Sequence, residues 1–318
     1  IMNIYKHIPS SIKKVHGCIL PLYAKDNYIY TADKKYLDLT SGIGALSTGH
    51  NHPHVISKVT EQLTKYVHLP QQVFQTHPIQ MEVSEKIIDT MPDGLDNIFY
   101  VNSGSEAIEN AIKIARLYTG KSNIITMNGG FHGRTLGALS VTSSNTACRK
   151  NIAPLMSNVY YCNDFNKKTL DTILEYQSCP SDTAAILLEP VQGECGIFTI
   201  NVDFLQYIQA ICNNNNILLI ADEVQCGAMR TGTWWNVQEK NITPDLMTFG
   251  KGIASGYPFA GVISRSDIMN SLSSGNLGGT YGGNAICSAA ASATIDIMND
   301  IDYQTNINNM GLYIKNNL

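Results

Sequence analysis

The sequence predicts an α/β protein built around a mostly parallel β-sheet, with helices on both faces. Short apolar runs rich in β-branched residues recur along the chain, each closes on a polar or glycine-rich turn, and helical patterns separate them. The composition is that of a folded globular chain, since 44% of the 318 residues are hydrophobic and 15% are charged. A chain of this length is expected to form about two domains, or one large domain with an appendage.

The expected strands follow one another along the chain, and most of them end at a cluster that can carry chemistry. The runs with their closing turns are IFYVNSGS (98–105), NIITM (123–127) before GGFHGRT, AAILLEP (184–190), ILLIADE (217–223), DLMTFGKG (245–252) and AGVIS (260–264). Ligands of open parallel sheets bind beyond the carboxyl ends of the strands. We therefore expect the functional site at these turns.

The clearest expected helix follows the first run. Glu109 and Lys113 form a favourable i,i+4 pair on it, and its apolar stripe comprises Ala107, Ile108, Ala111, Ile112 and Ala115. The small residues 102–105 precede this helix, and the free N–H groups of a helix N-terminus bind phosphate well. The sequence has neither GxxxxGK[ST] nor GxGxxG. The phosphate is therefore not expected to belong to a nucleoside triphosphate or a dinucleotide.

Charge and cysteine content limit the partners and the compartment. Lys and Arg total 22 against 26 Asp and Glu, a balance that argues against nucleic-acid binding and a polybasic membrane patch. No apolar run approaches the roughly 18 residues of a membrane span, and the first residues lack the pattern of a secretory signal. The eight cysteines are scattered without a CxxC pair, as in a reducing compartment. We expect a cytoplasmic protein, with the mitochondrial matrix as an open alternative.

Two further turns suggest an aldehyde cofactor. Asp222 ends an apolar run, and a carboxylate in such a dry place needs a cationic or strongly donating partner. Lys251 follows another apolar run between glycines, where its amine can act as a nucleophile towards an aldehyde. A phosphate site, a buried acid and a lysine match the phosphate, the ring nitrogen and the aldehyde of pyridoxal 5′-phosphate (PLP).

Six ordered blocks carry a resemblance to a known family. They are NSGSEAIENAIKIAR, GGFHGRTLGALSVT, LLEPVQGECG, LLIADEVQCGAMRTG, PDLMTFGKGIASGYPFAGV and GGTYGGNAICSAAA. In this order they resemble the class III (omega) PLP-dependent aminotransferases, most of all the 4-aminobutyrate type, with ornithine and acetylornithine aminotransferases as near relatives. The resemblance implies a fold-type I PLP-dependent transferase with a large domain and a small α+β domain.

The resemblance also implies roles for the residues of the cofactor site. Lys251 forms the internal aldimine and then transfers the proton, Asp222 keeps the pyridine nitrogen protonated, and Gln225 faces the phenolic oxygen. The remaining implied contacts are Gly104 and Ser105 to the phosphate, Phe131 stacked on the ring, and Thr280 to the phosphate bound by the neighbouring subunit. This last contact implies a homodimer with shared active sites.

The substrate residues implied by the resemblance are Arg134 for the distal carboxylate, Glu194 for a C-terminal arginine, and Ile43 as an apolar wall. The implied reaction moves an amino group from an omega-amino acid such as 4-aminobutyrate to 2-oxoglutarate. An ornithine or acetylornithine aminotransferase is the first alternative, and a cofactor-binding but inactive chain is the second. A structural ion pair is the alternative role for Arg134.

The expected domain division follows the same blocks. Residues 1–45 are expected to belong to the small domain, 46–290 to form the large PLP-binding domain, and 291–318 to form a linking helix and the start of a C-terminal domain that is incomplete here.

Some motifs have open or weaker interpretations. His50, His52 and His54 alternate in a pattern that can bind zinc, but the intervening proline and the lack of a nearby carboxylate or cysteine argue against it, and no metal is expected. His132 is either a proton carrier or a structural histidine. Cys195 and Met229 stand where the family usually has glycine. We expect Cys195 to remove a permissive φ, and Met229 to add bulk near the cofactor edge.

Overall fold

The computed structural model describes residue 9 and residues 19–318. The expected small-domain segment 1–45 therefore lies partly outside the described residues, in 1–8 and 10–18. The centre of the described part is a seven-stranded sheet of order β4-β12-β11-β10-β7-β5-β6. Its strands are β4 (Asn97–Val101), β5 (Asn123–Met127), β6 (Val159–Cys162), β7 (Thr183–Leu188), β10 (Leu218–Asp222), β11 (Leu246–Phe249) and β12 (Ala260–Ser264).

The sheet is mostly parallel, as predicted. Neighbours from β11 through β10, β7 and β5 to β6 pair in parallel. Strand β12 pairs antiparallel with both β11 and β4, so it alone runs against the others in this sheet. The expected apolar runs correspond to these strands, whereas the edge strand β6 was not expected from the sequence. The confirmed fold is that of an α/β protein.

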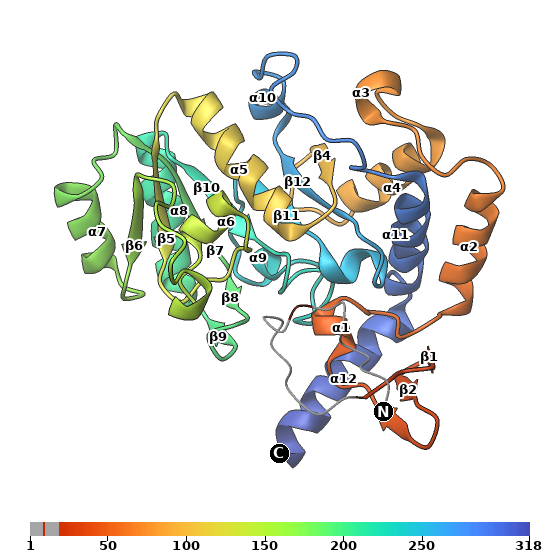
Figure 1. Ribbon diagram of the computed structural model, residues 1–318. Coiled ribbons are helices and arrows are strands. Elements are labelled where there is room, and N and C mark those ends of the chain that lie inside the picture. Colours follow the sequence, from red (N-terminus) through yellow and green to blue (C-terminus); the bar gives the residue numbers. More distant parts are fainter. Residues whose placement is uncertain (1–8, 10–18) are drawn as a thin grey trace.

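Helices cover both faces of the sheet (Figure 1). Neighbouring strand residues alternate between two hydrophobic clusters: Ile125 and Leu188 belong to one, and Ile124 and Leu187 to the other. Residues of α4, α7, α8, α9 and α11 pack in the first cluster, and residues of α5, α6 and α10 in the second. The bounds are α4 (Pro78–Ile88), α5 (Gly104–Thr119), α6 (Leu136–Val141), α7 (Lys167–Tyr176), α8 (Val202–Asn215), α9 (Asn236–Glu239), α10 (Ser266–Met269) and α11 (Ala285–Met298).

Helix α5 shows how the sequence sets the ends of an element. The Ser103 hydroxyl accepts a hydrogen bond from Glu106 N at 3.3 Å, and Gly120 closes the helix in the left-handed region at φ 68°. The expected apolar stripe is fully buried against the sheet. The expected Glu109–Lys113 pair was wrong: Glu109 Oε1 instead accepts from the backbone N of Gly137 and Ala138, at the start of α6.

Smaller elements surround the large sheet: β1, β2, α1 and α12 lie at the bottom of the view, and α2 and α3 lie at its right (Figure 1). A three-stranded antiparallel sheet contains β1 (Tyr23–Lys25), β2 (Tyr28–Tyr30) and β3 (Lys35–Leu37), and β8 (Val191–Gln192) pairs with β9 (Phe198–Thr199). The remaining elements are α1 (Ser41–Gly44), α2 (Pro53–Leu63), α3 (Gln71–Phe74), the 3-10 turns η1 (Thr146–Cys148) and η2 (Lys251–Ala254), and α12 (Ile301–Asn317). The expected domain boundary at residue 290 falls within α11.

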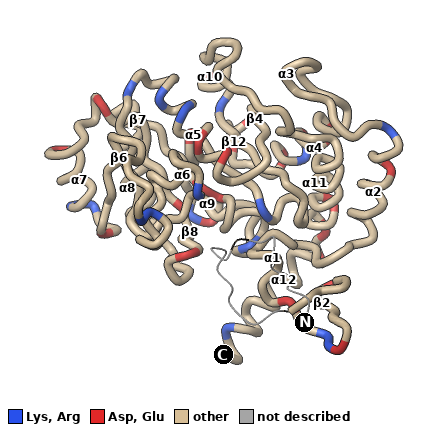
Figure 2. The backbone as a smooth tube through the Cα atoms, in the orientation of Figure 1, with Lys and Arg blue, Asp and Glu red and all other residues tan. Residues whose placement is uncertain are grey.

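Surface chemistry is mixed. Figure 2 shows Lys and Arg interspersed with Asp and Glu along the described chain. Every cysteine within residues 19–318 is a free thiol, and Cys18 lies outside the described residues. Among the helices that the structure describes, none is long and apolar enough to cross a membrane.

Candidate active site

An inner cavity of about 160 Å³ lies at the carboxyl edge of the large sheet. Each strand that reaches it supplies side chains from its end or from the turn that follows, as expected for a parallel sheet. The lining residues are Ser103, Gly104, Ser105, Phe131, His132, Gly133, Glu189, Asp222, Val224, Gln225 and Lys251. The cavity therefore brings together six of the sequence-predicted residues: Gly104, Ser105, Phe131, Asp222, Gln225 and Lys251.

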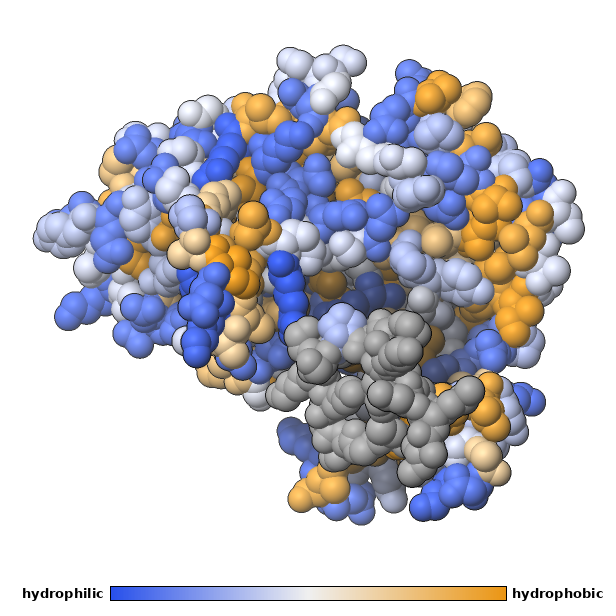
Figure 3. Space-filling model, in the orientation of Figure 1, coloured by the Kyte–Doolittle hydropathy of each residue, from blue (hydrophilic) through white to orange (hydrophobic). Residues whose placement is uncertain are grey.

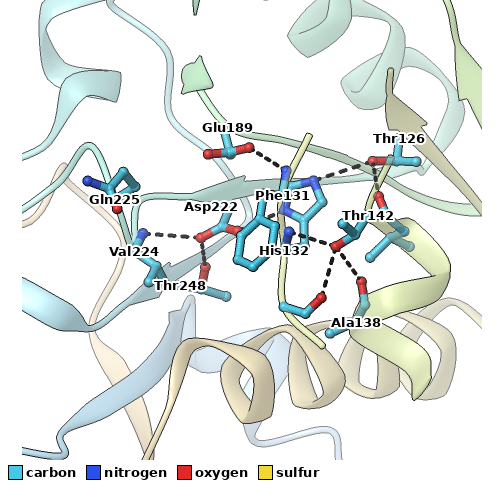
Figure 4. A network of polar contacts seen from close by, with 12 residues as sticks. Thr126, Phe131, His132, Ala138, Thr142, Glu189, Asp222, Val224, Gln225 and Thr248 are labelled. Atoms are coloured by element: carbon cyan, nitrogen blue, oxygen red, sulfur yellow. Dashed lines mark hydrogen bonds and ion pairs between the residues drawn. The ribbon is translucent and has the colours of Figure 1, made fainter. Parts of the chain in front are cut away.

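Asp222 ends β10 and is 3% exposed. Its Oδ2 lies 2.7 Å from His132 Nδ1, and its Oδ1 accepts from Val224 N at 3.1 Å and from Thr248 Oγ1 at 2.9 Å (Figure 4). These contacts supply the hydrogen-bond partners that a buried carboxylate requires. A carboxylate has about four acceptor positions, so Asp222 keeps the capacity to accept one more N–H.

His132 belongs to this network and is also buried. Burial disfavours its charged form, but the hydrogen bond to Asp222 and the charges of Asp222 and Glu189 raise the pKa of His132 overall. Its Nε2 lies 3.5 Å from Thr126 Oγ1, and its backbone N donates to Thr142 Oγ1 (Figure 4). Of the two interpretations of His132, a proton carrier or a structural histidine, these contacts favour the structural one. The ring lies against Asp222 and holds it in place.

Glu189 was missed by the sequence analysis. It follows β7 and is 3% exposed, with Oε1 accepting from Phe131 N at 2.8 Å and Oε2 from Gly193 N at 3.2 Å. Burial raises the pKa of Glu189 to about 7, and the charge of Asp222 adds to this effect while His132 opposes it. The sequence does contain a signal for Glu189, because this residue ends an apolar run just as Asp222 does.

Lys251 opens the 3-10 turn η2 directly after β11, and its Nζ donates to Gln225 Oε1. Its backbone has φ 44°, in the left-handed region that L-residues other than Asn and Asp seldom adopt. Such strain persists where the surrounding structure enforces it and is common at functional sites. The turn between β11 and β12 thus places this amine at the inner cavity.

The N-terminus of α5 forms one end of the inner cavity. Gly104 and Ser105 both line the cavity there, and a Cβ on Gly104 would lie 2.8 Å from Val224 Cγ1. Glycine is therefore required where α5 packs against the turn after β10. The unpaired backbone N–H groups of this first helical turn make an anion site.

An outer cavity of about 320 Å³ adjoins the inner one and shares Phe131, Glu189, Gln225 and Lys251 with it. Ile43 and Glu194 line this outer cavity, and Arg230, which the sequence analysis did not select, lines it as well. The other lining residues are Leu39, Thr40, Ser41, Gly44, Gly193 and Ile197.

Two sequence-predicted residues lie apart from these cavities. Arg134 is exposed and lines neither one; its guanidinium carbon lies 5.9 Å from the centre of the Phe131 ring, and its backbone N donates to Ser105 Oγ at 3.3 Å. It forms no ion pair with the residues that the structure describes. Thr280 is exposed and also lines neither cavity.

The expectation that Met229 adds bulk near the cofactor edge was wrong. Met229 lies 3% exposed in the hydrophobic core and lines a groove beside α12, so its bulk is not at the cofactor edge. It does occupy the left-handed region, at φ 62°. The backbone at Cys195 does not use the left-handed region, since the positive φ angles of that loop fall on Gly196 and Ile197.

The histidines of the 50–54 turn have separate partners. His50 Nε2 lies 2.9 Å from Asp38 Oδ2, and His54 Nε2 lies 3.3 Å from Asp296 Oδ2, so carboxylates are nearby after all. The His52 ring accepts from the backbone at the start of α2. Within the described ranges, no group of three or more His, Cys, Asp and Glu side chains is arranged to hold a metal ion.

Comparisons with known proteins bear on this site. Residues 10–318 match the family described as aminotransferase class-III. The chain is 36% identical to 5-aminovalerate aminotransferase DavT of Pseudomonas putida, over 92% of the chain and 71% of that protein. It is 36% identical to 4-aminobutyrate aminotransferase GabT of Escherichia coli, over 98% of the chain and 75% of that protein. With acetylornithine aminotransferase of Archaeoglobus fulgidus, it shares 35% identity over 100% of the chain and 80% of that protein.

Solved structures agree with these relatives. A transaminase from the marine bacterium Virgibacillus superposes with a TM-score of 0.86 at 26% identity, covering 92% of the chain and 72% of that structure. An ornithine aminotransferase from Toxoplasma gondii, described with partial occupancy of PLP at its active site, gives a TM-score of 0.83 at 26% identity, covering 92% of the chain and 69% of that structure.

The sheet and its cavity define a PLP-dependent transferase of fold type I. Within that class, the chain belongs to the class III aminotransferases, as the resemblance predicted. These enzymes depend on PLP, and the residues present fit it. The inner cavity offers an anion site at α5, a spare acceptor position on Asp222, an aromatic ring at Phe131 and the amine of Lys251. The relatives act on different amino donors, so membership of the family leaves the substrate open.

Proposed function

We propose that this aminotransferase moves the terminal amino group of an omega-amino acid of the 4-aminobutyrate type to 2-oxoglutarate, with Lys251 as the catalytic amine. The observation that carries the proposal is the position of Lys251 Nζ, which lies in one cavity with the buried Asp222 and the N-terminus of α5. When bound, PLP supplies an aldehyde and an electron-accepting ring.

Each residue of the inner cavity has its own proposed role in cofactor binding or proton transfer. Asp222 would accept a hydrogen bond from the N–H of the cofactor ring, and His132 keeps Asp222 oriented. Lys251 Nζ acts as the nucleophile and then carries the proton to and from the carbon that bears the amine. Gln225 donates towards the phenolic oxygen, Phe131 stacks on the ring, and Gly104 and Ser105 hold the phosphate.

The proposed substrate contacts are Arg134 with the distal carboxylate and Ile43 as an apolar wall. A guanidinium fork binds a carboxylate bidentately, and the guanidinium carbon of the exposed Arg134 lies 5.9 Å from the centre of the Phe131 ring, which itself lines the inner cavity. Glu194 lines the outer cavity and is proposed to pair with an arginine when no second carboxylate is bound.

A homodimer with shared active sites is the proposed assembly, with Thr280 contacting the phosphate held by the partner. The exposed Thr280 belongs to a loop beside α3, where a Cβ on Gly278 would lie 2.9 Å from Gln72 Nε2. Large apolar side chains are exposed on α2, α3 and α4 and beside Thr280, and Figure 3 shows apolar surface over α2 and α3. They are Ile56, Leu63, Val67, Val73, Phe74, Met81 and Tyr281. We also propose the division at residues 45 and 290 into a large domain and parts of a small one.

The donor is tested by steady-state rates. The PLP-loaded protein is assayed with 4-aminobutyrate, ornithine and N-acetylornithine, each with 2-oxoglutarate, and the highest kcat/KM is expected for 4-aminobutyrate. Preference for either ornithine compound would favour the alternative that has the same cofactor residues. Cofactor binding without turnover of any donor would favour the inactive alternative.

The role of Lys251 is tested by covalent trapping. Borohydride treatment of the loaded protein, followed by peptide mass spectrometry, is expected to find the cofactor fixed to the peptide that contains Lys251. Lys251→Ala should abolish this link, whereas Lys113→Ala, an exposed lysine on α5, should keep it. A link that survives in Lys251→Ala contradicts the assignment.

A further inference from the structure

The loop that carries Thr280 is rich in glycine. Residues 278–284, which lead into α11 and are called the glycine loop below, include four glycines. Glycine loses more conformational freedom on ordering than any other residue. A Cβ on Gly282 would collide with Tyr100 O of β4, so the loop approaches the sheet too closely for another residue there. Contacts from other elements are therefore needed to fix the loop in one position.

His77 connects the glycine loop to α4. This residue is 4% exposed and is the N-cap of α4, where its Nδ1 accepts from Gln80 N at 3.3 Å. Its Nε2 lies 3.1 Å from Gly283 O. Because Nδ1 accepts, the ring proton is on Nε2, and Nε2 donates to Gly283 O. One imidazole thus caps a helix with one nitrogen and holds the glycine loop with the other.

The surroundings of His77 keep its ring neutral. Burial lowers the pKa of His77, and the nearby His68 adds to this effect, while the hydrogen bond to Gly283 O opposes it. A proton on Nδ1 would also remove the acceptor of Gln80 N. Tyr66 packs edge-on against the ring, with the two ring centroids 5.6 Å apart. The ring is therefore held in the tautomer that donates to the glycine loop.

Packing joins the same two helices beside this hydrogen bond. Figure 1 shows α4 alongside α11. Residues near the start of both helices form one buried cluster, which contains Ile79, Ala285 and Ala289. Gly283 O also accepts from Ser288 Oγ of α11 at 3.0 Å. The carbonyl of Gly283, three residues after Thr280, is thus held from both helices.

We propose that His77 is a positioning residue, which holds the glycine loop so that Thr280 reaches the phosphate bound by the partner subunit. This inference rests on the proposed homodimer with shared active sites. Without the hydrogen bond from His77, the glycine loop has more conformations to lose when the cofactor binds. The effect is therefore expected at the site of the partner and not at the site of the chain that carries the substitution.

Two substitutions separate the tasks of the two ring nitrogens. His77→Asn keeps an acceptor for Gln80 N, because asparagine is a favoured N-cap, but its side chain is too short to reach Gly283 O. His77→Gln keeps a donor near the position of Nε2 and loses the cap. In thermal unfolding of the apoproteins, His77→Gln should therefore have the lower melting temperature. In PLP titrations, His77→Asn should have the lower affinity.

His52→Asn is the matched control. His52 also precedes a proline and caps a helix, since its ring accepts from His54 N at the start of α2. Within the described residues, no hydrogen bond joins the His52 ring to the glycine loop. His52→Asn should therefore leave PLP affinity unchanged.

Mixed dimers of co-expressed, differently tagged chains identify the site that is affected. One chain carries Lys251→Ala and keeps Thr280, and the other carries Thr280→Val and keeps Lys251. Cofactor fixed by borohydride then reports one site, which combines Lys251 of the second chain with Thr280 of the first. His77→Asn in the first chain should raise the PLP concentration for half-maximal fixing roughly 3- to 10-fold, the usual range for a lost hydrogen bond. His77→Asn in the second chain should leave that concentration unchanged.

Three results would overturn the inference. Equal weakening from either chain would mean that His77 only supports the fold. No weakening from the first chain, or a PLP affinity of His77→Asn at least as high as that of His77→Gln, would mean that the glycine loop does not depend on His77. Failure of the proposed shared site is recognised separately, because the Thr280→Val homodimer would then be fixed at the same PLP concentration as the mixed dimer without a change at His77.

Discussion

Asp222 and Glu189 are buried to the same degree at one cavity, yet their surroundings differ. Asp222 accepts from an imidazole, a hydroxyl and a backbone N–H, whereas Glu189 accepts from two backbone N–H groups. Burial raises the pKa of Glu189 to about 7, so this carboxyl can hold a proton near neutral pH. The site thus places a titrating acid, Glu189, beside Asp222, the proposed partner of the cofactor ring.

This difference predicts how stability depends on pH. The folded-state pKa of Glu189 is raised from 4.5 to about 7, so its contribution to stability is present at low pH and is lost as pH rises through this window. Glu189→Gln cannot ionise and should lack this loss. The difference in melting temperature, variant minus wild type, is therefore expected to increase between about pH 5 and about pH 8.

The melting temperatures are measured on the apoprotein, so that ionisation of the cofactor does not contribute to their difference. Glu223, whose pKa burial also raises to about 7, is present in both proteins and cancels in the difference. Glu175→Gln, an exposed carboxylate on α7, serves as the control and should give a difference that does not change with pH. A pH-independent difference for Glu189→Gln would contradict the prediction.

Sequence patterns identified some residues of the candidate site and missed others. Asp222 and Lys251 could be selected because each ends an apolar run and matches a family block. Glu189 satisfies the first condition too, but its importance comes from a cavity that only the folded sheet creates. Arg230 could not be selected, because the carbonyl that it contacts lies far from it in sequence, at Gly44.

Among the elements, α5 connects packing most directly to cofactor binding. Its first residue, Gly104, touches Val224, and Val224 N donates to Asp222. The helix that offers the anion site is thereby packed against the turn that orients the ring partner. A change at this contact alters both ends of the inner cavity.

Gly104→Ala should therefore weaken PLP binding and lower stability. The new Cβ would lie 2.8 Å from Val224 Cγ1, and the resulting overpacking costs about 1–3 kcal/mol. Gly311→Ala is the matched control, because no atom lies within 4 Å of its added Cβ and alanine favours the interior of α12. It should stabilise α12 by about 0.5–1 kcal/mol. PLP titration and thermal unfolding measure both effects, and unchanged PLP affinity in Gly104→Ala would contradict the first.

The elements that could be predicted are those buried on both faces. Strands β5, β7, β10 and β12 are buried throughout, so their sequences are continuous apolar runs. In contrast, β1 to β3 are short and mostly exposed or half-buried, and β6 lies at a sheet edge, so no continuous run marks them. The reversed direction of β12 has no signature in its periodicity, since it depends on the chain turning back directly after β11.

For the whole molecule, the proposed homodimer with shared active sites predicts complementation between two impaired chains. Lys251→Ala lacks the amine, and Thr280→Val is expected to lose the phosphate contact to its partner. In a mixed dimer, one site takes Lys251 from the second chain and Thr280 from the first, and is intact. The isolated mixed dimer, with one intact site of two, should therefore have about half of wild-type activity.

The assay uses a PLP concentration that saturates the wild type but not Thr280→Val, with co-expressed, differently tagged chains to isolate the mixed dimer. Each variant assembled alone provides the baseline. A mixed dimer no more active than the two baselines together would show that Thr280 does not act across the interface.

The antiparallel β12 has a consequence for motion. Because β12 pairs with β11 directly after the turn, the segment that contains Lys251 is hydrogen-bonded into the sheet through both of its flanking strands. The backbone at Lys251 is therefore a fixed pivot, and displacement of its amine during the reaction comes from rotation about side-chain bonds, on a nanosecond scale, rather than from slow rearrangement of a loop.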